Sequence, residues 1–225
     1  MLEASDITIG YGHNAVRGGI NFSASPGECI LLSGPNGCGK STLLRTIAGI
    51  LPVLGGNLHT EGSARMVPSR IPKVKGFTLR QFLRTGCYLQ SDWGGRLGPE
   101  ALKAEADALK LLSLDILSEK DISTLSDGQF QKACIASALA ASPDIVLLDE
   151  PTAFLDPGNK ISVMEALRSC AREKNVTVVF SSHDIHFAVK AADRVFCFGC
   201  DGGFYCSGPS EGSRDHTVRL GISIE

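Results

Sequence analysis

The sequence lacks a long apolar run, a leader-like start and any block of like charges. A membrane-spanning helix needs about 18–20 consecutive apolar residues, and the longest candidate, residues 133–141, is far shorter. We therefore expect that the chain does not cross a membrane unaided. The first residues contain no basic stretch followed by an apolar one, the pattern typical of secretory signals. This absence favours a cytoplasmic protein.

Charge is nearly balanced, with 22 basic and 24 acidic side chains and a net charge of -2. This balance argues against a dedicated nucleic-acid surface, so we expect no nucleic-acid partner. Residues 65–75 contain four basic and no acidic side chains, which leaves open either a solvated loop or a docking surface. The eight cysteines do not predict a disulfide framework, because a chain this long and apolar does not need one.

The 225 residues, 43% of them apolar, suffice for one domain with a sizeable core. Short apolar runs at 29–32, 145–148 and 176–180 alternate with helix-like segments, which predicts an α/β fold with a mainly parallel sheet. Residues 7–9 and 20–24 alternate like antiparallel strands, with Gly18-Gly19 between them and Pro26-Gly27 as a turn. We treat residues 1–225 as a single domain that contains a helical subdomain at about residues 78–125.

A complete phosphate-loop pattern, GPNGCGKS, occupies residues 34–41 between an apolar strand and a helix. In this pattern the glycines let backbone N–H groups converge on phosphates at a helix N-terminus. Lys40 is expected to reach the β- and γ-phosphates, and the Ser41 hydroxyl is expected to bind Mg²⁺. The predicted nucleotide-binding residues of this loop are Gly34, Pro35, Asn36, Gly37, Cys38, Gly39, Lys40, Ser41 and Thr42.

Two consecutive carboxylates, Asp149 and Glu150, follow the apolar run at 145–148. An acidic residue at the end of a neighbouring strand is the expected partner of a phosphate loop, because it can hold the metal. Asp149 is therefore predicted, with Ser41, to be a Mg²⁺ residue. Glu150 is predicted to orient or deprotonate the attacking water, which makes it a catalytic candidate.

Residues 124–129, TLSDGQ, predict the start of a helix, because Ser126 and Gln129 have the spacing of a capping box. A capped helix N-terminus that includes a glycine is also an anion site. Ser126, Gly128 and Gln129 are therefore predicted to contact a second phosphate group. One chain thus carries two predicted phosphate-binding ends, which are the N-terminus of the helix after the phosphate loop and the N-terminus of the helix that starts at TLSDGQ.

These ordered motifs, from Tyr11 to about residue 208, resemble the ATP-binding-cassette (ABC) ATPase subunits, whose signature sequence residues 125–129 follow closely. The resemblance implies a P-loop NTPase core, an N-terminal antiparallel β subdomain and the inserted helical subdomain. It also implies that Tyr11 stacks on adenine and that His183, as a second catalytic residue, senses the γ-phosphate. Each ATP is expected to lie between two copies of the chain, so the resemblance implies a homodimer of ATPase subunits.

Two positions depart from the family pattern. Asp127 stands where the signature more commonly has glycine, and Ser69 stands where the family usually has a glutamine that contacts Mg²⁺. The Ser69 hydroxyl is too short to reach the metal except through water. We therefore expect altered coupling and hydrolysis rate rather than lost nucleotide binding.

The resemblance implies a Mg²⁺-dependent ATPase that lies on the inner face of the cell membrane and drives an integral-membrane permease dimer. A substrate-binding protein is expected in the same system. Segments 83–88, 93–97 and 153–156 are similar to those of ATPases from iron-siderophore, haem and cobalamin importers. Two alternatives remain open: a soluble ABC ATPase of an assembly machine, such as iron–sulfur cluster biogenesis, and a weakly hydrolysing ABC subunit.

Overall fold

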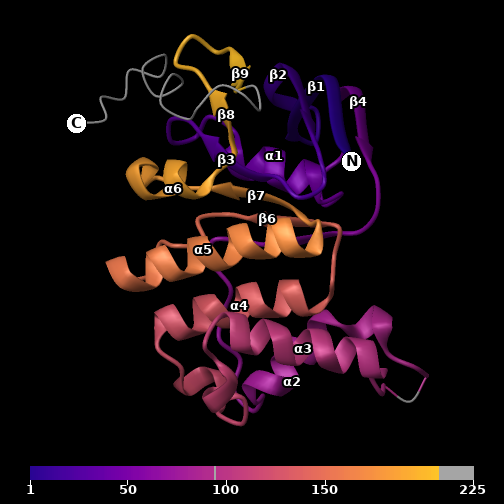
Figure 1. The fold of residues 1–225 in the computed structure, drawn as a ribbon. Helices are drawn as coiled ribbons and strands as arrows, with labels where there is room; N and C mark the ends of the chain where they lie inside the picture. The colour runs from indigo at the N-terminus through magenta and orange to yellow at the C-terminus, as the bar shows by residue number, and fades with distance from the viewer. Residues whose placement is uncertain (94, 208–225) are drawn as a thin grey trace.

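The computed structural model describes residues 1–93 and 95–207. It contains a small antiparallel sheet, a larger mainly parallel sheet and a layer of helices (Figure 1), which confirms the predicted α/β class. The predicted domain 1–225 also includes residues 94 and 208–225, which lie outside the described residues. Within the described part, no helix has both the length and the hydropathy of a membrane span.

The small sheet has the strand order β2-β1-β4, formed by Leu2–Tyr11 (β1), Asn14–Ala24 (β2) and Gly55–Thr60 (β4). Both pairings are antiparallel, and the predicted turn at Pro26-Gly27 follows β2. The chain turns at residues 12–13, where Gly12 has φ 58°. Gly18 and Gly19 lie inside β2, where the register with β1 shifts, because glycine accommodates a β-bulge.

The large sheet has the order β5-β6-β7-β3-β8-β9, and only its last pair, β8 with β9, is antiparallel. The central strands are buried along their whole length, which explains their uninterrupted apolar sequences. Strands β8 and β9 form an antiparallel hairpin at the end of this sheet. The strands are Cys29–Ser33 (β3), Ala64–Val67 (β5), Ile145–Leu148 (β6), Thr177–Ser181 (β7), Arg194–Phe198 (β8) and Phe204–Cys206 (β9).

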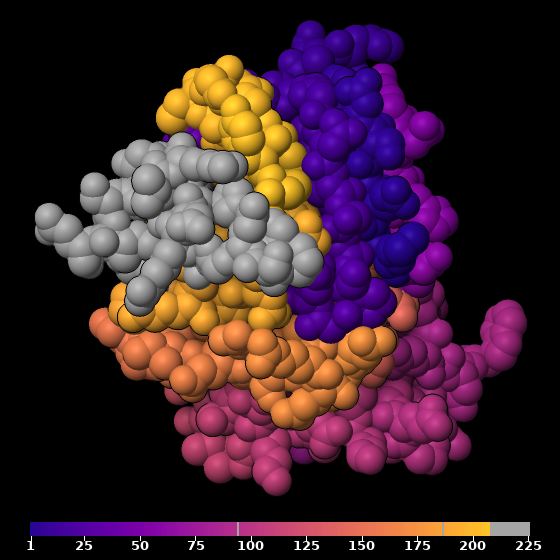
Figure 2. Space-filling view, turned by 45° about the horizontal axis from the view of Figure 1, so that its top comes forward, coloured from indigo at the N-terminus to yellow at the C-terminus, as the bar shows by residue number. Residues whose placement is uncertain are grey.

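Helices cover both faces of the large sheet. Helix α1 (Lys40–Ile47) packs between the two sheets, and α5 (Pro157–Lys174) and α6 (Ile185–Ala191) lie against the opposite face. Helices α2 (Leu79–Gly86), α3 (Pro99–Leu111) and α4 (Asp127–Ala140) pack together at the far end of the molecule. Figure 2 shows the same sequence of layers on the surface, from the indigo small sheet through orange α5 to the magenta helices.

Three short 3₁₀ helices complete the helical layer, at Tyr88–Gln90 (η1), Asp115–Leu117 (η2) and Ile122–Thr124 (η3). The elements from α2 to η3 fall within residues 78–125, and α4 packs against both α2 and α3. That residues 78–125 act as a separate subdomain stays a prediction.

The parallel strands place the predicted site residues at one edge of the sheet. The phosphate loop follows β3, Ser69 follows β5, Asp149 follows β6 and His183 follows β7. Because the carboxyl ends of parallel strands meet at the same edge, these segments converge although they are far apart in the sequence.

Candidate functional site

The loop between β3 and α1 has the backbone of an anion cradle. Three glycines of this loop, Gly34, Gly37 and Gly39, have φ values of 143°, 75° and 114°. Residues other than glycine rarely adopt this region of backbone conformation. A Cβ added at Gly34 would lie 2.9 Å from both Cys38 Sγ and Phe198 Cβ. The first turn of α1 contains no acidic residue, and no side chain caps its N-terminus. Its N–H groups therefore remain available for an anion.

Lys40 is buried, and its ammonium group lies over this loop. The Nζ atom donates hydrogen bonds to the carbonyl oxygens of Gly34 (2.8 Å) and Pro35 (3.0 Å). An ammonium has three donors, so one N–H remains for a phosphate oxygen. The loop thus holds a positive charge at the place where the sequence predicts phosphates.

Ser181, at the end of β7, joins the two predicted acidic residues. Its hydroxyl donates to Asp149 Oδ1 (2.8 Å) and accepts the backbone N–H of Glu150 (2.9 Å). The sequence did not single out this serine; its place at the end of the strand next to β6 was the available signal. The contact fixes the carboxylate of Asp149 and the backbone of Glu150 at the sheet edge.

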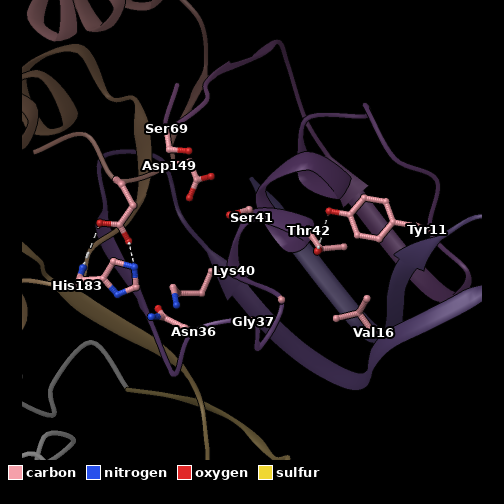
Figure 3. Close-up of a pocket in the computed structure, with 12 residues that line it drawn as sticks. Tyr11, Val16, Asn36, Gly37, Lys40, Ser41, Thr42, Ser69, Asp149 and His183 are labelled. Carbon is pink, nitrogen blue, oxygen red and sulfur yellow. Dashed lines mark hydrogen bonds and ion pairs between the residues drawn. The ribbon is translucent and has the colours of Figure 1, made fainter. Parts of the chain in front are cut away.

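Glu150 and His183 form a close pair (Figure 3). Glu150 Oε1 lies 3.1 Å from His183 Nε2, and Oε2 accepts the His183 backbone N–H at 3.2 Å. The Oε1 atom is buried and accepts no well-aligned hydrogen bond. Burial raises the pKa of Glu150 above its ordinary value, while His183 opposes the rise. A carboxylate of raised pKa with an available oxygen can accept a proton from water.

Tyr11 and most of the predicted phosphate-loop residues, but not Gly34, Pro35 or Cys38, line one cavity of about 440 Å³ (Figure 3), a typical size for a small-molecule site. At one end, the Tyr11 hydroxyl accepts hydrogen bonds from Thr42 Oγ1 and Arg45 Nη1, both at 3.3 Å. Val16 lies at the same end and was not predicted, because an exposed strand valine carries no distinctive signal. The lining residues are Tyr11, Val16, Asn36, Gly37, Gly39, Lys40, Ser41, Thr42, Ser69, Asp149, Glu150 and His183.

The metal candidates fit a hard cation. Ser41, Ser69 and Asp149 contribute only oxygen atoms to the cavity, which is the donor type that Mg²⁺ prefers. Asp149 is 4% exposed and forms no ion pair with any residue that the structure describes. A buried carboxylate without a basic partner is stabilised by a bound cation.

Ser126, Gly128 and Gln129 lie elsewhere, in a second cavity of about 550 Å³. Here the predicted capping box is present, since Ser126 Oγ accepts the Gln129 N–H (3.2 Å) and Gln129 Oε1 accepts the Ser126 N–H (3.0 Å). Neither Lys40 nor Asp149 lines this cavity. Within one chain, the two predicted phosphate-binding ends are therefore separate.

Comparison with known proteins agrees with these motifs. A family model described as "ABC transporter" matches residues 18–153. An uncharacterized ABC transporter ATP-binding protein of Methanocaldococcus jannaschii is 35% identical over 208 residues, which cover 87% of this chain and 72% of that protein. A Bacillus subtilis protein described as a siderophore transport system ATP-binding protein is 31% identical, and the match covers 85% of this chain and 74% of that protein.

A solved structure of a metal-chelate type ABC transporter in an inward-facing conformation has a similar fold. It superimposes with a TM-score of 0.83 at 27% identity, and the match covers 95% of this chain and 84% of that one.

Proposed function

Because the chain belongs to the ABC transporter ATP-binding family, we propose that it is the Mg²⁺-dependent ATPase subunit of an importer for an iron-siderophore or a similar metal chelate. The observation that carries the enzymatic part is the arrangement of Lys40, Ser41, Asp149 and Glu150 around one cavity. The relatives named for siderophore and metal-chelate transport support the cargo class. Neither is described as part of an assembly machine, so the iron–sulfur alternative gains no support.

Each residue of the site has a separate role in ATP hydrolysis. Backbone N–H groups of the phosphate loop and the Lys40 ammonium bind the phosphates, and Tyr11 stacks on the adenine. Ser41 and Asp149 hold Mg²⁺, which neutralises charge on the phosphates when bound. Ser69 contacts the Mg²⁺ through a water molecule. Glu150 orients the attacking water and takes its proton, while His183 contacts the γ-phosphate.

A complete site requires two copies of the chain. Ser126 and the N–H groups at the start of α4 lie in a different cavity from Lys40, so they cannot contact the same phosphates within one subunit. We place them against the nucleotide held by a second copy, in a dimer with two composite sites. The further partners of this proposal are an integral-membrane permease dimer, which this chain contacts at the inner face of the cell membrane, and a substrate-binding protein.

The test is uptake of a radioactive iron chelate by cells that lack this chain. Re-expression of the wild-type chain should restore uptake, whereas Lys40→Ala at equal abundance should not. Purification from gently solubilised membranes should recover a polytopic permease that stimulates the ATPase activity. Undiminished chelate uptake in the deleted cells, together with recovery of soluble assembly proteins alone, would overturn the transport proposal.

A further inference from the structure

A salt bridge joins the loop that carries Ser69 to the start of α4. Lys73 Nζ lies 2.7 Å from Asp127 Oδ1 and donates a second hydrogen bond, at 2.8 Å, to the Leu125 carbonyl. The same ammonium lies 5.6 Å from the centre of the Phe130 ring. Lys73 therefore contacts residues on both sides of Ser126, the N-cap of α4.

The two ends of this connection belong to different cavities. Ser69 lines the cavity of the phosphate loop, and Asp127 lines the cavity of Ser126 and Gly128. A third, smaller cavity between them is lined by Ser69, Lys73 and Asp127. The segment 69–73 thus runs from one predicted phosphate site to the other and is fixed at its far end by Lys73.

The charge of Asp127 explains why such a contact is needed. Its carboxylate lies between Ser126 and Gly128 in sequence, at a helix end that the proposed function assigns to a phosphate group. An uncompensated carboxylate there would repel the phosphates. The ion pair adds little to folding, because the Asp127 side chain is 75% exposed and solvent screens its charge, although Lys73 is 26% exposed.

We propose that Lys73 is a positioning residue that neutralises Asp127 and holds the Ser69 loop against the N-terminus of α4, so that this helix end can accept a phosphate of the nucleotide bound by a second copy. The inference rests on the shared-site arrangement of the proposed function. It adds a residue that touches neither nucleotide and acts through Asp127 and Leu125.

The experiment measures ATP-dependent dimerisation by analytical ultracentrifugation, with ATP binding to the monomer measured separately by a fluorescent ATP analogue. Lys73→Ala should weaken the ATP-bound dimer about tenfold and leave ATP binding to the monomer unchanged. The double variant Lys73→Ala/Asp127→Asn should recover most of that loss, because no carboxylate then needs a partner. Lys75→Ala is the matched control, since it removes an exposed lysine from the same loop and should change neither quantity.

Each outcome is decisive. A Lys73→Ala chain that dimerises like the wild type, a double variant as weak as Lys73→Ala, or a Lys75→Ala chain equally weak overturns the role of Lys73. If Lys73→Ala does not fold, Lys73→Met carries the test: it keeps the alkyl stem beside Phe130 but removes the charge, and it should weaken the ATP-bound dimer about as much. A wild-type chain that binds ATP but stays monomeric at every concentration overturns the shared-site proposal itself, and the Lys73 role with it.

Discussion

At the residue scale, the chemistry of the site depends on how Glu150 is held. Its backbone adopts φ 54°, which is uncommon for a residue with a side chain, and its N–H is bound by Ser181. Strained backbone of this kind persists where the surroundings over-determine it, as at active sites. The strained conformation directs the carboxylate toward His183 at the edge of the sheet.

Glu150→Gln should preserve ATP affinity and slow hydrolysis by about a hundredfold or more, the usual scale for losing a general base. The amide keeps the shape of the side chain but cannot take a proton from water. Steady-state phosphate release gives the rate, and calorimetry gives the affinity. Turnover close to that of the wild type would remove Glu150 from its assigned role.

The pH dependence of hydrolysis follows from the contact between Glu150 and His183. In its proposed role as a base, Glu150 must be ionised, so kcat/KM should fall as the pH drops through its pKa, which burial has raised. His183 lowers that pKa, and its largest contribution is electrostatic. In His183→Ala the pKa should therefore rise further, and the acid limb of the kcat/KM profile should move to higher pH. An acid limb at the wild-type position would contradict this electrostatic link.

At the element scale, α2 and α3 are joined by one buried carboxylate. Glu105 of α3 is 1% exposed and forms ion pairs with Arg80 (2.9 Å) and Arg84 (2.8 Å) of α2. Arg80 also pairs with Glu119, which is 73% exposed. The two carboxylates share a partner but differ in burial, so they separate the contribution of a buried pair from that of a surface pair.

Glu105→Ala should lower the free energy of unfolding by about 2 kcal/mol, because it removes a buried hydrogen-bonded partner of two arginines, whose 38% and 44% exposed side chains can regain water. Glu119→Ala should cost less than about 1 kcal/mol, because an exposed ion pair is screened by solvent. Urea unfolding followed by circular dichroism measures both. Equal losses in the two variants would show that burial does not set the strength of these contacts.

The sequence predicted the elements whose signal is local. Strands β3, β6 and β7 were found because burial on both faces makes them uniformly apolar. Strand β4 was missed, since its sequence GGNLHT lacks both alternation and an apolar run. The phosphate loop was found as one contiguous motif. Lys73 was not, because its partner Asp127 lies 54 residues away and nothing in the local pattern of either residue indicates the other.

At the scale of the whole molecule, the two predicted phosphate-binding ends are parts of one chain but of different cavities. Helix α4 brings Ser126 to the second cavity, while the ends of β3 and β6 bring Lys40 and Asp149 to the first. Under the proposed function, a monomer offers two incomplete sites, and a two-fold dimer can complete both at once, because each copy supplies the part that the other lacks.

This complementarity predicts the behaviour of mixed dimers. A Ser126→Arg chain should bind ATP in its own phosphate loop but block the site of its partner, and Lys40→Ala should weaken ATP binding in its own loop. Each variant alone should be nearly inactive. An equimolar mixture should recover about a quarter of wild-type activity, because half of the dimers are mixed and each of these has one intact site of two.

Phosphate release from titrated mixtures measures that recovery. Each variant alone, at the same total concentration, is the control. Activity that never exceeds that of the separate variants has two explanations: the sites are not shared, or both must be intact together. Crosslinking of differently tagged chains in the presence of ATP separates them. Mixed dimers that form without activity mean that both sites are required, whereas the absence of ATP-dependent mixed dimers means that the shared-site geometry is wrong.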